Sequence, residues 1–230
     1  MQTAYLLDGA SSRVLVDCGV TTLLGLEQAK LSDASITHIV ISHLHGDHFG
    51  GLVWFLMHAT FVLRRTTPLD IYGPVGIEAR VTAAFDVLYP GVQESLGGFE
   101  VRYHEMHADM VTNVGGIDVT PFVVLHPSGA PSHALRFEEN GRVLAFSGDS
   151  EWTEALVIAG KNADLYLMEC YKFEGNPVMH LSWKTIQQHL DRIGCKRIVL
   201  THMSQEMLDR RGEVHDGRIA FGEDGAVFDV

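Results

Sequence analysis

The sequence predicts a mixed α/β or α+β domain, in which short strands and helices interleave along the whole chain. Three observations predict it: short β-branched runs bounded by turn residues, apolar residues at helical spacing, and the lack of a Pro/Gly-rich linker or internal repeat. The length of 230 residues fits one domain, and 46% hydrophobic with 20% charged residues is the composition of a globular protein. We therefore expect a single domain over residues 1–230.

The N-terminal segment predicts an opening β-hairpin, because the runs Thr3 to Leu7 and Arg13 to Asp17 flank a Gly-Ala-Ser-Ser turn. A helix is expected around Leu23 to Lys30. The run Thr37 to Ser42 is β-branched and apolar, which predicts a buried strand that stops where a histidine cluster begins. The apolar region Leu52 to Leu63 follows this cluster. It predicts a helix packed in the core, with a pocket wall or a dimer face as the alternatives.

Further strands and helices alternate through the rest of the chain. One helix is expected over Val75 to Leu88 and another over Ser182 to Ile193. In the second helix apolar residues repeat at helical spacing, Ser182 can cap the start, and Gly194 can end it. The remaining strands are expected at Leu69 to Tyr72, Glu100 to Tyr103, Ile117 to Val124, His133 to Glu138, Arg142 to Ser147, Leu165 to Met168 and Arg197 to Thr201.

Composition limits the partners. The formal net charge is −12, from 17 basic and 29 acidic residues, which disfavours a broad electrostatic grip on long nucleic acid. A small anionic substrate stays compatible, because bound divalent metals create a local positive field. Three cysteines without metal-type spacing indicate a reducing compartment, so we expect the cytoplasm. No stretch reaches the roughly 18 apolar residues of a membrane-spanning helix, and no signal segment begins the chain, so no membrane partner is expected.

The chemistry is expected at the motif His43-Leu44-His45-Gly46-Asp47-His48, which puts three imidazoles and a carboxylate within six residues. These ligands suit zinc, manganese or iron, and the lack of cysteine in the motif argues against a structural thiolate zinc site. The motif follows a predicted strand, and Gly46, Gly50 and Gly51 would permit tight turns that let the side chains converge. The alternative is a histidine-rich surface loop.

With HLHGDH the chain resembles the metallo-β-lactamase superfamily, whose signature is HxHxDH. The segment Val16-Asp17-Cys18-Gly19 is similar to one in its ribonuclease Z-like branch. The resemblance implies a four-layer αββα sandwich, an Asp17 that orients a metal-bound histidine, and two divalent metal ions, zinc with manganese or iron as alternatives. The implied ligands are His43, His45 and His126 for one metal, Asp47, His48 and His202 for the other, and a bridging Asp149. Asp47 is counted among the catalytic residues as well.

Hydrolysis is the expected reaction, because two such metals can activate a bridging hydroxide. The resemblance to ribonuclease Z-like phosphodiesterases implies that His180 protonates the leaving group and that Glu169 supports it. The alternatives are a helix-capping or solvent-facing His180 and an ordinary ion pair at Glu169. We expect a phosphodiesterase acting on a small or short phosphate ester. Hydrolysis of a lactone, thioester or β-lactam is the alternative function.

Processing of tRNA 3'-ends ranks below these functions, and so does a non-catalytic metal-binding module. Only Pro127 to Gly148 separates His126 from Asp149, which leaves no room for the long flexible arm that ribonuclease Z enzymes commonly carry there. His133 is expected at an exposed strand start, with substrate contact as the alternative. His104 and His107 are assigned to an ordinary strand end or loop. A homodimer is compatible with the resemblance.

Overall fold

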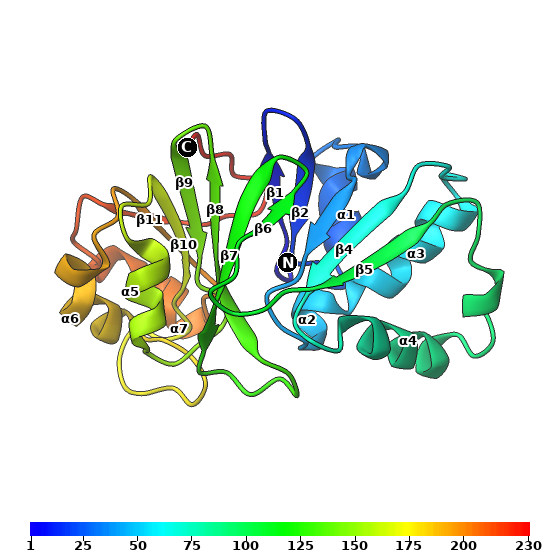
Figure 1. Ribbon diagram of the computed structural model, residues 1–230. Helices are drawn as coiled ribbons and strands as arrows, with labels where there is room; N and C mark the ends of the chain where they lie inside the picture. The colour runs from blue at the N-terminus through cyan, green and yellow to red at the C-terminus, as the bar shows by residue number, and fades with distance from the viewer. The chain divides into compact units, whose positions relative to one another are not determined.

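In the computed structural model, which describes residues 1–230, the chain forms two compact units, each built around one sheet (Figure 1). Unit 1 comprises Met1–His107 and Val114–Gly116, and unit 2 comprises Ala108–Asn113 and Ile117–Val230. The interleaved strands and helices confirm the predicted α/β class. The expectation of one domain over residues 1–230 stays a prediction.

Unit 1 holds a five-stranded sheet in the order β1-β2-β3-β4-β5. The strands β1 and β2 form the predicted antiparallel hairpin, and every later pair is parallel. Helices supply the crossovers that parallel strands need. The strands are β1 Tyr5–Asp8, β2 Arg13–Val16, β3 His38–Val40, β4 Leu69–Gly73 and β5 Val101–Glu105; the helices are α1 Thr22–Gln28, α2 Gly46–Phe49, α3 Gly51–Phe61 and α4 Ile77–Leu88, with 3-10 turns η1 Asp33–Ser35 and η2 Gln93–Ser95.

The parallel strands of unit 1 position the histidine motif. Their carboxyl ends meet at one edge of the sheet, and the motif leaves β3 at this edge. Helix α3 follows directly, and its side chains Leu52, Phe55 and Leu56 are fully or almost fully buried. This burial confirms the predicted core helix in the apolar region after the motif, whereas its last residues, Phe61 and Val62, are exposed.

Unit 2 holds a seven-stranded sheet in the order β12-β11-β10-β9-β8-β7-β6. The central strands β7, β8 and β9 pair antiparallel, and β9 to β12 pair parallel. The strands are β6 Thr112–Val114, β7 Ile117–Val124, β8 Ser132–Glu139, β9 Arg142–Phe146, β10 Leu165–Glu169, β11 Ile198–Thr201 and β12 Ile219–Phe221; the helices are α5 Glu154–Gly160, α6 Trp183–Ile193 and α7 Gln205–Asp209, with the 3-10 turn η3 Arg211–Glu213. Strands β6 and β12 and helices α5 and α7 were not predicted from the sequence.

Helix α6 has the predicted boundaries. The Ser182 hydroxyl accepts a hydrogen bond from the Thr185 N–H at 3.3 Å, as an N-cap does. Gly194 ends the helix in the left-handed conformation, with φ +69°. One face of the helix is buried in the core of unit 2, next to the sheet, through Trp183, Ile186, Leu190 and Ile193.

The expectation of an exposed His133 is wrong. This residue lies in β8, which is paired on both sides, with β7 and with β9. The neighbouring segment from Ser132 to Leu135 is entirely buried, and only 1% of the His133 surface is exposed. His133 pairs with Val123 of β7, while the pairing of β8 with β9 begins only at Leu135, so its burial depends on tertiary packing that a local pattern does not reveal.

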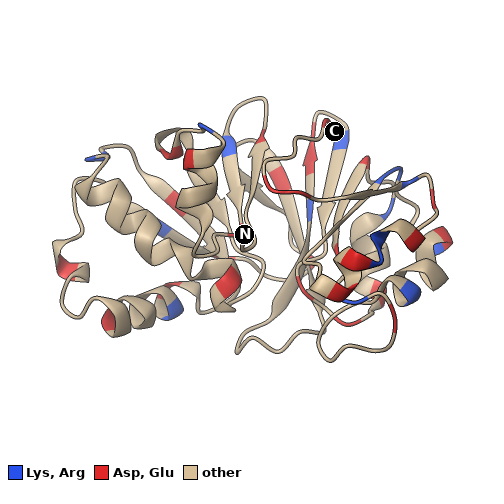
Figure 2. Cartoon of the chain, turned by 180° about the vertical axis from the view of Figure 1, so that it is seen from behind, with Lys and Arg blue, Asp and Glu red and all other residues tan.

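Acidic and basic positions are scattered along the chain in both units, with more acidic than basic residues (Figure 2). All three cysteines are buried and none is disulfide-bonded. None of the helices combines the length and the apolar character that crossing a membrane requires.

Candidate metal centre

In unit 1, the predicted ligands lie on a tight turn next to the end of β2. The Cys18 N–H donates to the His48 carbonyl at 2.6 Å, and the Gly51 N–H donates to the Cys18 carbonyl at 2.8 Å. A Cβ on Gly51 would collide with the Gly19 carbonyl oxygen, so this close approach requires glycine. We call this group the N-terminal cluster, which consists of Asp17, His43, His45, Asp47 and His48.

Asp17 is the buried hydrogen-bond acceptor of the N-terminal cluster, and its side chain is fully buried. Its carboxylate accepts the Ser42 N–H at 2.7 Å, the Ser42 hydroxyl at 2.8 Å and the His48 Nδ1 at 2.7 Å. Burial raises the pKa of the Asp17 carboxyl, and the His48 imidazole with the Ser42 donors offsets part of this increase. Asp17 therefore contacts a motif histidine, as the resemblance implies.

These hydrogen bonds fix the histidine tautomers. The Ser42 hydroxyl has one proton and gives it to Asp17, so it accepts a hydrogen bond from His43 Nδ1 at 3.1 Å. His43 and His48 both carry a proton on Nδ1, and each would coordinate a metal through Nε2. His48 Nε2 lies 3.6 Å from an Asp47 carboxylate oxygen, and the ligand atoms of His43 and His45 lie within 4.8 Å of each other.

In unit 2, a second group of predicted residues gathers where strands of the sheet end. His126 follows β7, Asp149 follows β9 and His202 follows β11, while Glu169 is the last residue of β10. The Asp149 Oδ2 atom faces three imidazoles, with His202 Nε2 at 3.3 Å, His180 Nδ1 at 3.9 Å and His126 Nε2 at 4.0 Å. We call this group the C-terminal cluster, which consists of His126, Asp149, Glu169, His180 and His202.

His180 and Glu169 form the pair that the resemblance implies. His180 Nδ1 lies 3.1 Å from Glu169 Oε2, and Glu169 Oε1 accepts the Ser150 N–H at 2.5 Å. Burial, together with the nearby charge of Asp149, raises the pKa of Glu169 well above its usual range. His180 is not the cap of α6, because Ser182 occupies that position. The Glu169 side chain is buried, so it is no surface ion pair.

Two residues of this region were missed by the sequence analysis. His126 Nδ1 lies 2.8 Å from the Met179 carbonyl, and the Met179 N–H donates to a Glu151 carboxylate oxygen at 2.9 Å. A carbonyl can only accept, so His126 also carries its proton on Nδ1 and would bind a metal through Nε2. Met179 contributes only backbone atoms to these contacts, and backbone contacts leave no signal in residue type.

His104 has a structural partner outside the clusters. His104 lies in β5 and its Nε2 is 2.8 Å from Asp70, which also accepts a 2.6 Å hydrogen bond from Arg102.

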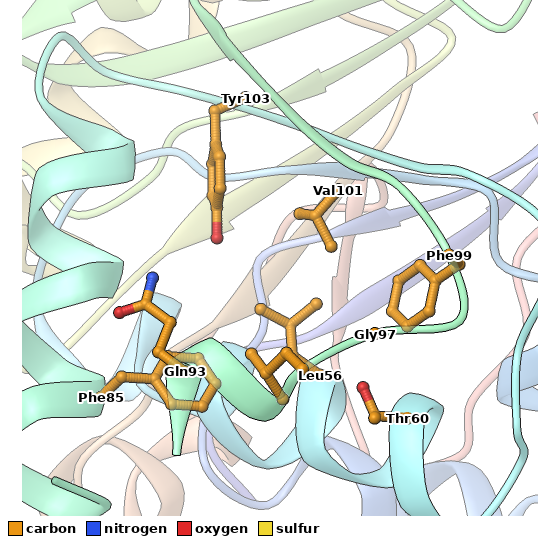
Figure 3. A pocket seen from close by; sticks show the side chains of 9 residues that line it. Leu56, Thr60, Phe85, Gln93, Gly97, Phe99, Val101 and Tyr103 are labelled. Atoms are coloured by element: carbon orange, nitrogen blue, oxygen red, sulfur yellow. The ribbon is translucent and has the colours of Figure 1, made fainter. Parts of the chain in front are cut away.

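Unit 1 also contains a cavity of about 210 Å³ beside α3, α4 and β5 (Figure 3). Its walls are mostly apolar, with the polar side chains of Thr60, Gln93 and Tyr103, and no predicted site residue lines it.

The donor set of each cluster fits a divalent metal ion. Each cluster combines imidazole nitrogens with carboxylate oxygens and contains no thiolate, which suits zinc, manganese or iron. The fixed Nδ1–H tautomers of three histidines add to this fit, because an imidazole coordinates a metal through its unprotonated nitrogen.

Comparison with known proteins relates the whole chain to one family. A family model described as "Anti-Pycsar protein Apyc1" matches residues 1–228. A ribonuclease Z from Shouchella clausii is 26% identical, over 94% of this chain and 86% of its own. Among solved structures, the metallo-beta-lactamase fold protein YhfI from Bacillus subtilis has a TM-score of 0.76 and 19% identity, over 99% of this chain and 90% of its own. The short form of human tRNase Z has a TM-score of 0.75 and 25% identity, over 99% and 92%. The predicted metallo-β-lactamase fold is confirmed.

Proposed function

Because the chain belongs to the Anti-Pycsar protein Apyc1 family of the metallo-β-lactamase superfamily, we propose that it is a phosphodiesterase that hydrolyses small or short phosphate esters with two metal ions. The observation that carries this proposal is the pairing of His180 with Glu169 inside the C-terminal cluster. An imidazole held by a buried carboxyl, beside predicted metal ligands, has the geometry of a proton donor to a leaving group.

We propose that the ligands are those implied by the sequence motifs: His43, His45, Asp47, His48, His126, Asp149 and His202. The support is the order of the motifs, the family match over almost the full chain, and the donor geometry within each cluster. Zinc is the metal we expect, with manganese or iron as alternatives. When bound, the ions would lower the pKa of a water molecule and stabilise the negative charge that develops on the phosphate.

The residues of the chain supply orientation and protons. Asp17 fixes the ring of His48, and Ser42 fixes that of His43. Glu169 holds His180 through Nδ1, so that Nε2 is the atom that would deliver a proton to the departing oxygen. Burial raises the pKa of Glu169, which favours keeping a proton within the Glu169 and His180 pair at neutral pH.

Cleavage of tRNA is a weaker candidate for the substrate than a small ester. The whole segment between His126 and Asp149 consists of short loops and the antiparallel hairpin β8–β9. No inserted arm lies there. The excess of acidic residues also disfavours long nucleic acid, because a phosphate backbone is bound by clustered basic side chains.

The first experiment combines elemental analysis of the purified protein with turnover of bis(p-nitrophenyl) phosphate, a lactone and a β-lactam under one metal loading. The proposal expects two metals and selective phosphodiester turnover, which would justify assays with cyclic nucleotides and short oligonucleotides. Two metals with only lactone or β-lactam turnover would favour the alternative function. No stoichiometric metal after reconstitution would contradict the metal centre itself.

The proton-donor role predicts that His180→Ala keeps its metal but loses about a hundredfold or more of the phosphodiester rate, as removal of a general acid does. Metal content and turnover are measured on the same sample. His189→Ala is the matched control, because His189 stacks on Trp152 outside the clusters, with ring centroids 4.0 Å apart. Loss of a metal in His180→Ala would identify His180 as a ligand, and an unchanged rate would remove it from the mechanism.

A further inference from the structure

The loop that carries His180 is closed at its base and exposed at its tip. It leaves the sheet after β10, and the N–H groups of Tyr171 and Lys172 both approach the Leu181 carbonyl, at 3.0 and 3.3 Å. Between these ends the chain turns outward, and 78% of Val178 is exposed. The position of His180 therefore depends on the contacts that fix the segment between Val178 and Leu181.

Met179 is the point at which the loop is held. Its backbone has φ +68°, a left-handed conformation that is unfavourable for a residue with a side chain. Two hydrogen bonds act on this residue: its N–H donates to Glu151 at 2.9 Å, and its carbonyl accepts from His126 Nδ1 at 2.8 Å. Neither bond uses the Met179 side chain, so the contact depends on the backbone conformation.

Glu151 connects this point to the rest of the C-terminal cluster. It lies two residues after Asp149. Its N–H donates to the carbonyl of Leu125 at 3.0 Å in an isolated antiparallel β-bridge, and Leu125 is the residue before His126. The backbone of Glu151 is therefore fixed beside two predicted ligands, Asp149 and His126, while its carboxylate reaches the loop at Met179.

We propose that Glu151 is a positioning residue, which holds the backbone of Met179 against the imidazole of His126. The contact keeps the proton of His126 on Nδ1, so that Nε2 is available to a metal. It also fixes the residue after Met179, which is His180, within reach of Glu169. This inference rests on the proposed function, because it takes His126 as a ligand and His180 as the proton donor.

The test is a competition titration of metal-stripped protein with Zn²⁺ against a chelator, without any substrate. Glu151→Ala removes the acceptor of the Met179 N–H, and we expect Zn²⁺ affinity to fall about 10- to 100-fold, as it does when residues behind a ligand are lost. Glu151→Gln retains a carbonyl oxygen at the same place and should restore most of this affinity. Glu154→Ala is the matched control and should leave Zn²⁺ affinity unchanged, because the exposed Glu154 side chain pairs with Arg192 outside the clusters.

A second measurement uses hydrogen exchange of residues 173–180 in the metal-free proteins. Exchange should be faster in Glu151→Ala than in the natural protein, and close to natural in Glu151→Gln. Wild-type Zn²⁺ affinity and wild-type exchange in Glu151→Ala would overturn the inference, and so would an equal loss of affinity in Glu151→Gln. Absence of phosphodiester turnover in a protein that binds Zn²⁺ would contradict only the proposed function, since neither measurement here uses a substrate.

Discussion

Asp17 shows how one residue can determine the properties of several others. It takes a left-handed backbone conformation, with φ +58°, directly after β2, and its buried carboxylate accepts hydrogen bonds from both Ser42 groups and from His48. A buried polar network of this kind is costly when one member is removed, because its partners stay desolvated. The sequence indicated Asp17 through the Asp-Cys-Gly segment, but the threefold role of its two oxygens is a property of the fold.

We expect Asp17→Asn to weaken metal binding at His48 about 10- to 100-fold, because an amide is a poorer acceptor for the Nδ1–H that orients this ring. Chelator competition with Zn²⁺ measures the change. Asp33→Asn is the control, since Asp33 makes a similar 2.8 Å contact with His58 Nδ1 in unit 1, away from the N-terminal cluster. Equal affinities in Asp17→Asn and the natural protein would show that Asp17 does not orient a ligand.

At the scale of elements, α6 was predictable because its signals are local. Apolar residues at helical spacing, a serine at the start and a glycine past the end all lie within the helix or beside it. The strand β8 shows the opposite case. Its polar residues Ser132 and His133 are buried, although only β7 pairs with them, through Val124 and Val123. The rest of the fold decides this burial, and the residues of β8 do not show it.

Loss of the α6 cap should be measurable as a loss of stability. We expect Ser182→Ala to lower the free energy of unfolding by about 1 kcal/mol, because the Thr185 N–H loses its acceptor. In a chain of this size the melting temperature should fall by about 2–4 °C, which calorimetry can measure. Ser95→Ala is the control on an exposed 3-10 turn and should leave the melting temperature unchanged. Equal melting temperatures in the two variants would contradict the capping role.

At the scale of the whole molecule, metal binding and stability should be linked. A metal that binds only the folded chain stabilises it by about 2.7 kcal/mol when its concentration is a hundred times its Kd. We therefore expect Zn²⁺ to raise the melting temperature of stripped protein by roughly 5–10 °C. His126→Ala should show a smaller shift, since one predicted ligand is missing. A melting temperature that does not respond to Zn²⁺ in the natural protein would contradict a metal centre that binds the folded state.

The sequence by itself determined where most of the strands and helices lie, which fold family they belong to, and which residues are the predicted ligands, but not β6, β12, α5 or α7. These properties depend on the period of apolar residues and on short motifs such as HLHGDH, so a local segment contains them. The tertiary structure decided the rest: the burial of His133, the pairing of His180 with Glu169, and the contact of Met179 with His126. These depend on segments far apart in the chain and, for Met179, on backbone atoms that every residue shares. Residue type alone cannot specify such contacts, because the fold chooses the partners.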